Sequence, residues 1–444
     1  MDFDVLVIGG GIQGVGVLHD LASRRITTHL LEERQLSIGT SSRSTKLLHG
    51  GLRYLERLGQ WSLVREALNE RSLLLRLLGD AVKPVPFVLP AYRSGRPPWM
   101  IRMGLGLYDL LAGDSGLPHA RTISLQELRA RAPYVRKERL EADLAAAFMF
   151  YDGQMLDDVI VRLAARASTL LGGSYQENSR VDHVERLESG FKVTGSQLGP
   201  TGRLRFEYRA KMVVMAGGAW NNWNLVKWGI APQVPCILNA GSHLVLSQAA
   251  VTADPKNCAA TLIQNSDGRV LFFIPWFGRW LFGTTESAVI GDPRNLKPSA
   301  EDTEYLFKAL DDNFDLNTPR KNVDEVFCGV RTMPLRQAAD KIKVTRQLQE
   351  DPFQSPLYLQ STKDNLTRLS RESVVNEPVP GMLVIYGGKY TTYRGLSEQV
   401  GRQIKDRLGK GTCSNTRTAD AWFLNEIREQ NPEIFVSSKE LRSA

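Results

Sequence analysis

The sequence predicts an α/β fold with two domains, one built on a parallel sheet and the other on a mixed or antiparallel sheet. A length of 444 residues exceeds that of one ordinary domain, which favours two. The first residues combine an apolar run, a glycine-rich turn and a helical pattern, and this combination is typical of a βαβ unit. In the middle of the chain, apolar and polar residues alternate as they do in an antiparallel sheet.

The chain opens with the βαβ pattern. Residues 4–8 (DVLVI) form a short apolar run that is typical of a buried parallel strand. Residues 15–24 have the apolar spacing of a helix, and residues 27–31 predict a second strand that ends at Glu32. Since a glycine-rich turn separates the first strand from the helix, we predict a Rossmann-type domain at this end of the chain.

The turn carries the pattern G-x-G-x-x-G on Gly9, Gly11 and Gly14. Gly9 permits a tight turn, Gly11 lets the backbone approach a pyrophosphate, and Gly14 lets the helix pack on the strand. The N-terminus of the helix attracts phosphate charge. Glu32 would accept hydrogen bonds from ribose hydroxyls and would repel a 2′-phosphate, so NADP is not expected. The pattern predicts a dinucleotide and leaves FAD and NAD open.

The other elements indicate that the Rossmann-type domain is discontinuous. Residues 58–82 predict an amphipathic helix, and residues 172–215 contain strands that return the chain to the first domain. Residues 234–290 alternate as in an antiparallel sheet, which predicts a substrate domain. The expected division is 1–80, 150–232 and 368–410 for the nucleotide-binding domain, 81–149 and 233–367 for the substrate domain, and 411–444 for a short C-terminal helical tail.

Composition limits the partners of the protein. A formal net charge of +8 favours anionic partners, but no zinc-finger spacing or RNA-binding aromatic pattern is present, so we expect no nucleic acid. The four cysteines include no C-x-x-C pair, which predicts neither a metal site nor a dithiol centre. The N-terminal apolar run has no basic leader, and no apolar run reaches about 18 residues. We therefore expect a cytoplasmic protein, or one on a membrane surface, without a signal peptide or a spanning helix.

Five motifs occur in an order that resembles one family. They are TSSRSTKLLHGGLRYLE (40–56), AGGAW (216–220), GSHLVL (241–246), GVR (329–331) and YGGKYTTYR (386–394). Together they resemble the FAD-dependent glycerol-3-phosphate dehydrogenases, members of the D-amino-acid-oxidase superfamily of flavoenzymes, over roughly residues 3–395. The resemblance implies that the Rossmann-type domain binds FAD.

The resemblance also implies which residues contact FAD. Ser41, Ser42 and Lys46 would line the pyrophosphate and the flavin. Val181 would offer a backbone contact to adenine, and Gly388 would admit the flavin ring because it lacks a β-carbon. For His49 we expect packing and hydrogen bonding beside the flavin. The expected cofactor-binding residues are Gly9, Gly11, Ile12, Gly14, Glu32, Ser41, Ser42, Lys46, His49, Val181, Ala216, Gly217, Trp220, Gly388, Lys389 and Thr392.

Oxidation of a secondary alcohol requires a hydride acceptor, a base and groups that fix the substrate. His243 is the expected base, because GSHLVL matches the family segment with that role and because histidine exchanges a proton near neutral pH. Arg53 and Arg331 match residues that hold the substrate phosphate in the family. The expected catalytic residues are His243, Arg331 and Lys389, and the expected substrate-binding residues are Arg53, Tyr54, Arg331, Lys389 and Thr391, with Thr392 as an alternative to Thr391 and with Arg368 as a further candidate.

Reduced flavin must pass its electrons on, and relatives use either quinone or oxygen. The segment 96–113 (RPPWMIRMGLGLYDLLAG) resembles the part of the dehydrogenases that enters the bilayer surface, and its apolar, aromatic and basic residues suit an interface. We therefore expect quinone as the acceptor and peripheral attachment to the inner face of the cytoplasmic membrane. The alternative is a helix buried against the substrate domain.

Several functions stay open from the sequence. The first is oxidation of sn-glycerol 3-phosphate to dihydroxyacetone phosphate, or of a related phosphorylated polyol. The second is an amine, amino-acid or 2-hydroxy-acid oxidase of the same superfamily, in which Arg331 would hold a carboxylate. The others are a flavin-binding redox module without turnover and a nicotinamide dehydrogenase, which would leave the flavin-family motifs unexplained. The acceptor, the oligomeric state (including a homodimer) and the roles of residues 337–366 and of the short C-terminus are not determined by the sequence.

Overall fold

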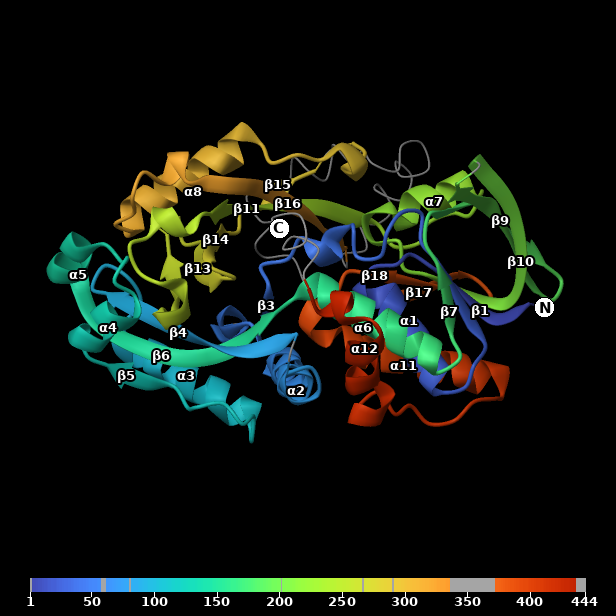
Figure 1. Cartoon of the computed structure of the whole chain (residues 1–444), viewed down its shortest axis with the longest axis horizontal. Coiled ribbons are helices and arrows are strands. Elements are labelled where there is room, and N and C mark those ends of the chain that lie inside the picture. The colour runs from blue at the N-terminus through green and yellow to red at the C-terminus, as the bar shows by residue number, and fades with distance from the viewer. Residues whose placement is uncertain are drawn as a thin grey trace.

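The structure is a computed structural model that describes residues 2–56, 61–79, 81–200, 202–265, 267–289, 291–335 and 372–436, and the side chains of Arg53 and Glu56 lie outside this description. Two sheets occupy opposite ends of the long axis of the molecule, and helices cover both of them (Figure 1). One sheet is largely parallel and the other is mixed, which confirms the predicted α/β fold class.

The first sheet has eight strands with a parallel centre. Its order is β17-β18-β10-β1-β2-β7, and β9 pairs with both β10 and β8. The neighbours from β18 through β10, β1 and β2 to β7 are parallel. The beginning, middle and end of the chain therefore meet in one sheet, although the residue boundaries of the predicted domains stay a prediction. The strands are β1 (Phe3–Ile8), β2 (Thr28–Leu31), β7 (Ser174–Gln176), β8 (Ser179–Leu187), β9 (Gly190–Gly199), β10 (Gly202–Met215), β17 (Val374–Val379) and β18 (Met382–Tyr386).

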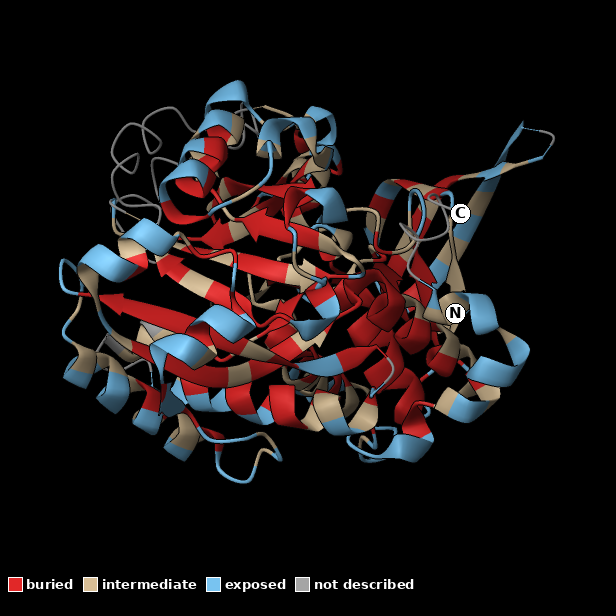
Figure 2. Ribbon diagram, turned by 60° about the vertical axis from the view of Figure 1, so that its left-hand side comes forward, coloured by how far each residue is buried: buried red, intermediate tan, exposed pale blue. Residues whose placement is uncertain are grey.

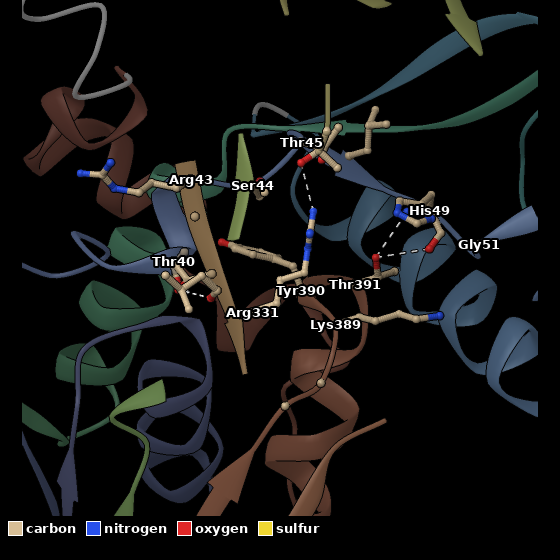
Figure 3. A pocket seen from close by; sticks show the side chains of 18 of the residues that line it. Thr40, Arg43, Ser44, Thr45, His49, Gly51, Arg331, Lys389, Tyr390 and Thr391 are labelled. Carbon is tan, nitrogen blue, oxygen red and sulfur yellow. Dashed lines mark hydrogen bonds between the residues drawn. The ribbon is translucent and has the colours of Figure 1, made fainter. Parts of the chain in front are cut away.

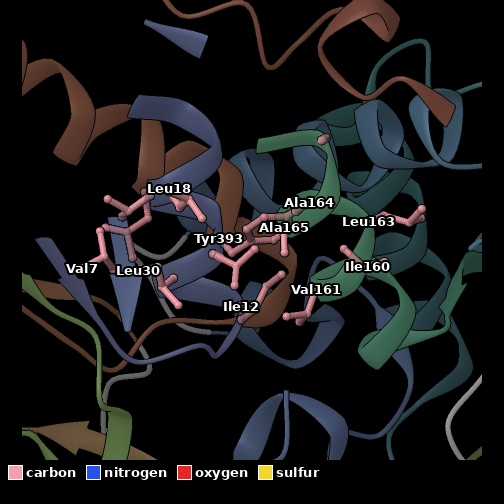
Figure 4. Packing of buried hydrophobic residues seen from close by; sticks show 14 of the residues in the cluster. Val7, Ile12, Leu18, Leu30, Ile160, Val161, Leu163, Ala164, Ala165 and Tyr393 are labelled. Carbon is pink, nitrogen blue, oxygen red and sulfur yellow. The ribbon is translucent and has the colours of Figure 1, made fainter. Parts of the chain in front are cut away.

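The parallel strands are buried on both faces, which explains their uninterrupted apolar sequences. On β1, Val5 and Val7 belong to the core shared with the helices, whereas Leu6 and Ile8 belong to the core on the side of β8 and β9. Figure 4 shows side chains of three helices meeting over the sheet near Val7. These helices are α1 (Ile12–Ser23), α6 (Asp157–Leu170) and α11 (Tyr393–Leu408), and α7 (Asn221–Lys227) packs on the other side.

The second sheet has ten strands and is almost entirely antiparallel. Its order is β15-β11-β14-β13-β12-β4-β6-β3, with β16 beside β11 and β5 beside β6. The pairing of β12 with β4 is parallel. The strands are β3 (Leu47–Leu48), β4 (Val82–Tyr92), β5 (Arg121–Ile123), β6 (Leu144–Met155), β11 (Cys236–Leu246), β12 (Ala260–Gln264), β13 (Val270–Trp276), β14 (Arg279–Gly283), β15 (Ser287–Ala288) and β16 (Val323–Pro334).

Helices surround the second sheet, and these helices have one buried face and one exposed face (Figure 2). Helix α2 (Trp61–Leu77) lies within the helix predicted over 58–82, and α3 (Pro98–Ala112) packs beside it. The other helices here are α4 (Leu125–Arg131), α5 (Lys137–Asp143) and α8 (Ala300–Asn313). Short 3-10 helices that border the cavity described below are η1 (Thr40–Ser42), η2 (Leu52–Glu56), η3 (Gly218–Trp220) and η9 (Tyr390–Thr392). The others in the described residues are η4 (Gln248–Ala250), η5 (Pro255–Asn257), η6 (Pro293–Asn295), η7 (Pro319–Lys321), η10 (Ala419–Ala421) and η11 (Pro432–Phe435).

Helix α1 begins earlier than the apolar pattern predicted. Gly11 is its N-cap in an extended conformation, so the helix follows the turn at Ile12 without a connecting segment. Gly14 therefore lies inside the first turn, where a β-carbon would come within 1.9 Å of the carbonyl oxygen of Gly9. A side chain at Gly14 would therefore prevent the close approach of the helix to the turn, and Gly14 itself, unlike Gly9 and Gly11, does not border the cavity described below. Residues 337–366 and Arg368 lie outside the described residues.

The segment after α11 packs back onto the first sheet's helices through His19 and Trp422. The Trp422 ring meets the His19 ring edge-on, with the ring centroids 4.6 Å apart. His19 Nε2 lies 2.7 Å from the carbonyl oxygen of Ala421, and since a carbonyl only accepts, Nε2 donates this hydrogen bond. Helix α12 (Leu424–Gln430) follows directly. Burial of the ring lowers the pKa of His19 to about 4.

We expect His19 to make the stability of the protein depend on pH. Histidine titrates near pH 6.5 in an unfolded chain, so the unfolded state binds more protons than the folded state between about pH 6.5 and 4. Above about pH 6.5 the neutral His19 ring makes its full contribution to stability. As the pH falls toward 4, the free energy of unfolding decreases by about 3 kcal/mol. Urea unfolding of the wild type and of His19→Gln, which keeps a donor for Ala421, measures this difference. Equal losses in both proteins on acidification would contradict the prediction.

Candidate functional site

A cavity of about 1900 Å³ is lined by residues of both sheets and extends to helix α3. It exceeds the roughly 300–1,000 Å³ of an ordinary small-molecule pocket, so it has room for a large ligand together with a small one. Its walls come from the turn after β1, the end of β2, the segment 37–55, strands β11 and β16, and the turn before α11. Figure 3 shows the part of the cavity where the last three of these segments meet.

The glycine turn forms one wall at the carboxyl ends of β1 and β10. Gly9 has φ +113°, and a β-carbon there would lie 2.5 Å from the carbonyl oxygen of Ala216. Gly11 borders the cavity beside Ser41, whose hydroxyl accepts a hydrogen bond from the Ile12 amide at 2.9 Å. The N-terminus of α1 therefore faces the cavity, where the helix dipole favours an anion.

Glu32 lines the cavity at the end of β2. Its Oε2 accepts a hydrogen bond from the Gly10 amide at 2.6 Å, and its Oε1 accepts one from the Arg34 amide at 2.9 Å. Burial raises the pKa of Glu32, and these two amides act in the opposite direction. The carboxylate is held at the edge of the cavity, and its contact with a ribose stays a prediction.

Two residues expected at the cofactor, Ser42 and Lys46, do not line the cavity. The Lys46 ammonium is buried and donates to both carboxylate oxygens of Asp157, at 2.6 and 2.7 Å. It also donates to the carbonyl oxygen of Ser42 at 2.8 Å. The expectation that the Lys46 side chain lines a pyrophosphate is therefore wrong, because the side chain holds the segment 42–46 onto α6 instead.

Several other expected cofactor residues do line the cavity. At one end these are Val181, Ala216, Gly217 and Trp220. The Trp220 indole donates to a carboxylate oxygen of Asp292 at 3.3 Å, which fixes its ring. The roles predicted for these residues toward a cofactor stay predictions.

His243 lies on β11 and borders the cavity, with 1% of its surface exposed. Its Nε2 is 3.0 Å from the Thr45 hydroxyl, and its ring stacks on Phe327 with the centroids 4.9 Å apart. On the neighbouring strand β14, a β-carbon at Gly283 would lie 2.6 Å from Cδ2 of the ring. The imidazole occupies this position because Gly283 has no side chain.

Arg331 lies on β16 opposite the same strand β11. Its Nη2 donates to the Thr284 hydroxyl at 3.2 Å, and the guanidinium borders the cavity. A β-carbon at Gly241 would lie 2.6 Å from Arg331 Nη2. Glycines in the sheet therefore make room for both the expected base and the expected cation.

Sequence reasoning missed Asp302, which lies behind these two side chains. Its carboxylate accepts hydrogen bonds from the hydroxyls of Ser242 and Thr285, both at 2.8 Å, and from Ser287 at 2.6 Å. The local pattern S-A-E-D predicts only a helix start, and Ser299 does accept from the Asp302 amide at 3.0 Å. Nothing in that pattern indicates a bond to a strand about sixty residues away.

The turn before α11 brings Lys389 and Thr391 to the segment that contains His49. The His49 amide donates to the Thr391 hydroxyl at 3.3 Å (Figure 3), whereas the contact of Thr391 with a substrate stays a prediction. The Lys389 ammonium lies 4.1 Å from the centroid of the Tyr54 ring. Gly388 also borders the cavity, with φ +90°.

Two further predicted residues, Thr392 and Arg53, contribute no described side chain to the wall of the cavity. Thr392 is the N-cap residue of α11 and does not line the cavity, so its expected contact with a cofactor or substrate is not supported. The side chain of Arg53 lies outside the described residues, and its role stays a prediction.

Residues 4–373 match the family described as DAO, FAD dependent oxidoreductase. The chain is 31% identical to the mitochondrial glycerol-3-phosphate dehydrogenase of Mesocricetus auratus, over 98% of the chain and 57% of that protein. It is 32% identical to a glycerol-3-phosphate dehydrogenase of Pseudomonas aeruginosa, over 91% of the chain and 72% of that protein. It is also 32% identical to D-erythritol 1-phosphate dehydrogenase of Brucella abortus, over 90% and 73%. The chain spans less than two thirds of the length of the mammalian relatives that it matches.

Among solved structures, the chain resembles the glycerol-3-phosphate dehydrogenase of Bacillus halodurans complexed with FAD. The TM-score is 0.67 at 22% identity, over 100% of this chain and 74% of the other. At this identity the likeness shows the fold alone, and it agrees with the sheet arrangement in Figure 1.

The burial of Lys46 leads to a testable prediction. Lys46→Met removes the ammonium and leaves Asp157 buried without its cation, which should lower the free energy of unfolding by about 3–5 kcal/mol. Adding Asp157→Asn should recover part of the loss, because the unpaired charge is removed. Urea unfolding measures both effects. The control Lys137→Met, in an exposed ion pair with Glu141, should have no measurable effect, and an equally small loss in Lys46→Met would refute the structural role.

Proposed function

The chain belongs to the DAO family of FAD-dependent oxidoreductases, and we propose that it oxidises sn-glycerol 3-phosphate to dihydroxyacetone phosphate with FAD as its cofactor. One observation carries the proposal: a dinucleotide-type glycine turn borders the same cavity as a buried histidine, an arginine and a lysine. These residues are His243, Arg331 and Lys389, and they come from three separate segments of the chain. The curated relatives named for glycerol 3-phosphate support this substrate.

The residues of the cavity fit FAD. The pyrophosphate would lie at the N-terminus of α1, where Gly11 has no side chain and the amides of the first turn attract an anion. Glu32 would hold the ribose, the backbone of Val181 would contact adenine, and Gly388 would lie against the flavin. When bound, FAD supplies the acceptor for the hydride that leaves the alcohol carbon.

His243 would take the proton that leaves the alcohol oxygen. The imidazole is buried, and its Nε2 is held 3.0 Å from the Thr45 hydroxyl at the cavity wall. The stacked Phe327 ring restricts rotation of the imidazole, so the proton-accepting nitrogen keeps one direction. The imidazole would accept the hydroxyl proton while the hydride leaves the carbon that bears this hydroxyl.

Arg331 and Lys389 would bind the substrate phosphate. An arginine can contact two phosphate oxygens at once, and Lys389 adds a second positive charge above the Tyr54 ring. We propose that Arg53 completes this group. Three cations match the double negative charge of a phosphate better than the single negative charge of a carboxylate. This favours a phosphorylated alcohol over an amino acid or a 2-hydroxy acid as the substrate.

A second candidate is a longer phosphorylated polyol. The relative named D-erythritol 1-phosphate dehydrogenase is as similar to this chain as the bacterial glycerol-3-phosphate dehydrogenase is. Both substrates present a phosphate and a neighbouring secondary alcohol, so they need the same base and the same cations.

Anaerobic reduction of the FAD-loaded protein tests the function. We expect glycerol 3-phosphate to bleach the flavin absorption rapidly, whereas lactate, amino acids and unphosphorylated glycerol should not. Faster bleaching by erythritol phosphate would select the second candidate. Bleaching by an amino acid, with none by either phosphate ester, would sink the proposal.

In the same experiment, His243→Ala and Arg331→Ala should have different effects. Loss of the base should slow bleaching by about 10²–10⁴-fold with little change in substrate affinity. Loss of the guanidinium should weaken substrate binding by roughly ten- to a hundredfold, the value of a hydrogen bond to a charged group. Matched controls are His183→Ala and Arg320→Ala, since both side chains are exposed and neither lines the cavity.

Helix α3 supports the proposal of a membrane-bound acceptor. Its outer face exposes Trp99, Met103 and Leu110 to 62%, 65% and 77%, while Leu105 and Tyr108 are buried, so only one face of the helix is covered. None of the helices in the described part of the chain combines the length and the apolar composition that a membrane span requires. We propose that α3 lies in the surface of the inner face of the cytoplasmic membrane and that quinone accepts the electrons. The cavity reaches Met100, Ile101 and Leu107 on this helix, which would give quinone an apolar route inward.

Flotation with anionic lipid vesicles tests the membrane contact. The wild type should float, and replacement of Trp99, Met103 and Leu110 by serine should leave the protein at the bottom, because each exposed side chain contributes roughly tenfold to partitioning. Leu198→Ser with Leu204→Ser is the control, since these exposed leucines lie on the β9–β10 hairpin that projects from the body in Figure 2. A wild type that stays at the bottom would exclude this mode of attachment.

A further inference from the structure

A buried hydrogen-bonded chain runs from helix α3 to the wall of the cavity. The Tyr108 hydroxyl donates to Oδ1 of Asp152 at 2.8 Å, and Arg71 Nη1 donates to the same oxygen at 2.6 Å. Tyr108 and Asp152 are 1% and 5% exposed. Burial raises the pKa of Asp152 to about 6, so the carboxylate is ionised at neutral pH and accepts both bonds.

The same Tyr108 hydroxyl accepts a hydrogen bond from the Gly50 amide at 2.8 Å. Because the hydroxyl proton is directed to the carboxylate, a lone pair of the oxygen is directed to Gly50. The backbone lies directly on the tyrosine ring, since a β-carbon at Gly50 would be 2.9 Å from Tyr108 Cε2 and 2.7 Å from the Leu68 side chain. The position of Gly50 is therefore set by contacts outside the cavity.

The segment that begins at Gly50 leads to the proposed phosphate ligands. The Tyr54 amide donates to the Gly51 carbonyl oxygen at 2.9 Å, which closes a turn over residues 51–54. A β-carbon at Gly51 would lie 2.4 Å from the Tyr54 ring and 3.5 Å from the Lys389 ammonium. Displacement of this backbone would therefore move the ring on which the ammonium rests, at 4.1 Å. In Figure 3, Lys389 extends toward Gly51 along this wall.

We propose that Tyr108 and Asp152 are positioning residues that fix the backbone of Gly50 and thereby place Tyr54 and Lys389 for binding the phosphate of the substrate. This inference rests on the proposed function of the cavity and extends it to residues of α3 and β6. Tyr108 acts through Gly50 and has no contact with the reacting atoms. Its loss should therefore weaken phosphate binding and leave the proton transfer to His243 intact.

Tyr108→Phe in the FAD-loaded full chain tests the inference, with inorganic phosphate as the probe. The dissociation constant of phosphate, measured from the change in the flavin spectrum, and the KM for glycerol 3-phosphate should each rise about five- to tenfold, the value of one hydrogen bond. The kcat and the FAD content should not change. Gly50→Ala, which pushes the backbone off the Tyr108 ring, should reproduce the effect.

Tyr134→Phe is the matched control. Tyr134 is also buried, in the turn between α4 and α5, where its hydroxyl lies 3.0 Å from that of Thr261 on β12, and it does not line the cavity. Its replacement should leave both constants unchanged. Unchanged phosphate binding in Tyr108→Phe and Gly50→Ala, or a wild type that binds no phosphate, would overturn the inference. If phosphate binds more weakly in Tyr108→Phe but glycerol 3-phosphate does not reduce the wild type, the inference holds and the substrate is wrong.

Discussion

The close approach of Gly9 to Ala216 is the constraint on which the site depends. The carboxyl ends of β1 and β10 meet there at a distance that leaves no space for a β-carbon. Because the chain turns so tightly, α1 can begin at once and direct its N-terminus into the cavity. The same turn brings the Gly10 amide to the Glu32 carboxylate. One backbone contact thus arranges the anion-binding end of a helix and a carboxylate around a common space.

Two glycines of the second sheet leave the space that its functional side chains occupy. Gly241 and Gly283 lie where any side chain would displace Arg331 or His243. The Arg331 and His243 side chains can therefore both be accommodated on the paired strands β16 and β11. The Asp302 carboxylate accepts hydrogen bonds from three hydroxyls next to these positions, those of Ser242, Thr285 and Ser287. These bonds fix the strands that carry the two glycines.

Three buried ion pairs hold cations in structural roles. Lys46 pairs with Asp157, Arg71 with Asp152, and Arg394 with Glu70, each at 2.6 Å. Each pair joins segments far apart in the chain, and removal of one partner leaves a buried charge without its counter-ion, which lowers stability. Arg331 and Lys389 differ from these cations because they border the cavity itself. The two classes occur within a few residues of one another, as Lys389 and Arg394 show.

The sequence by itself determined the elements whose signals are local. The apolar run before Gly9, the glycine spacing and the strand patterns around His243 each depend on neighbours within a few residues, and the structure has those elements where they were expected. The tertiary structure alone decided which polar groups serve the cavity. Lys46 and Lys389 both lie in motifs shared with the family, yet one is held by Asp157, 111 positions away, and the other reaches the cavity. Asp302 and Tyr108 carry no local signal for the same reason: the partners that give them a role are brought to them only by the packing of distant strands and helices.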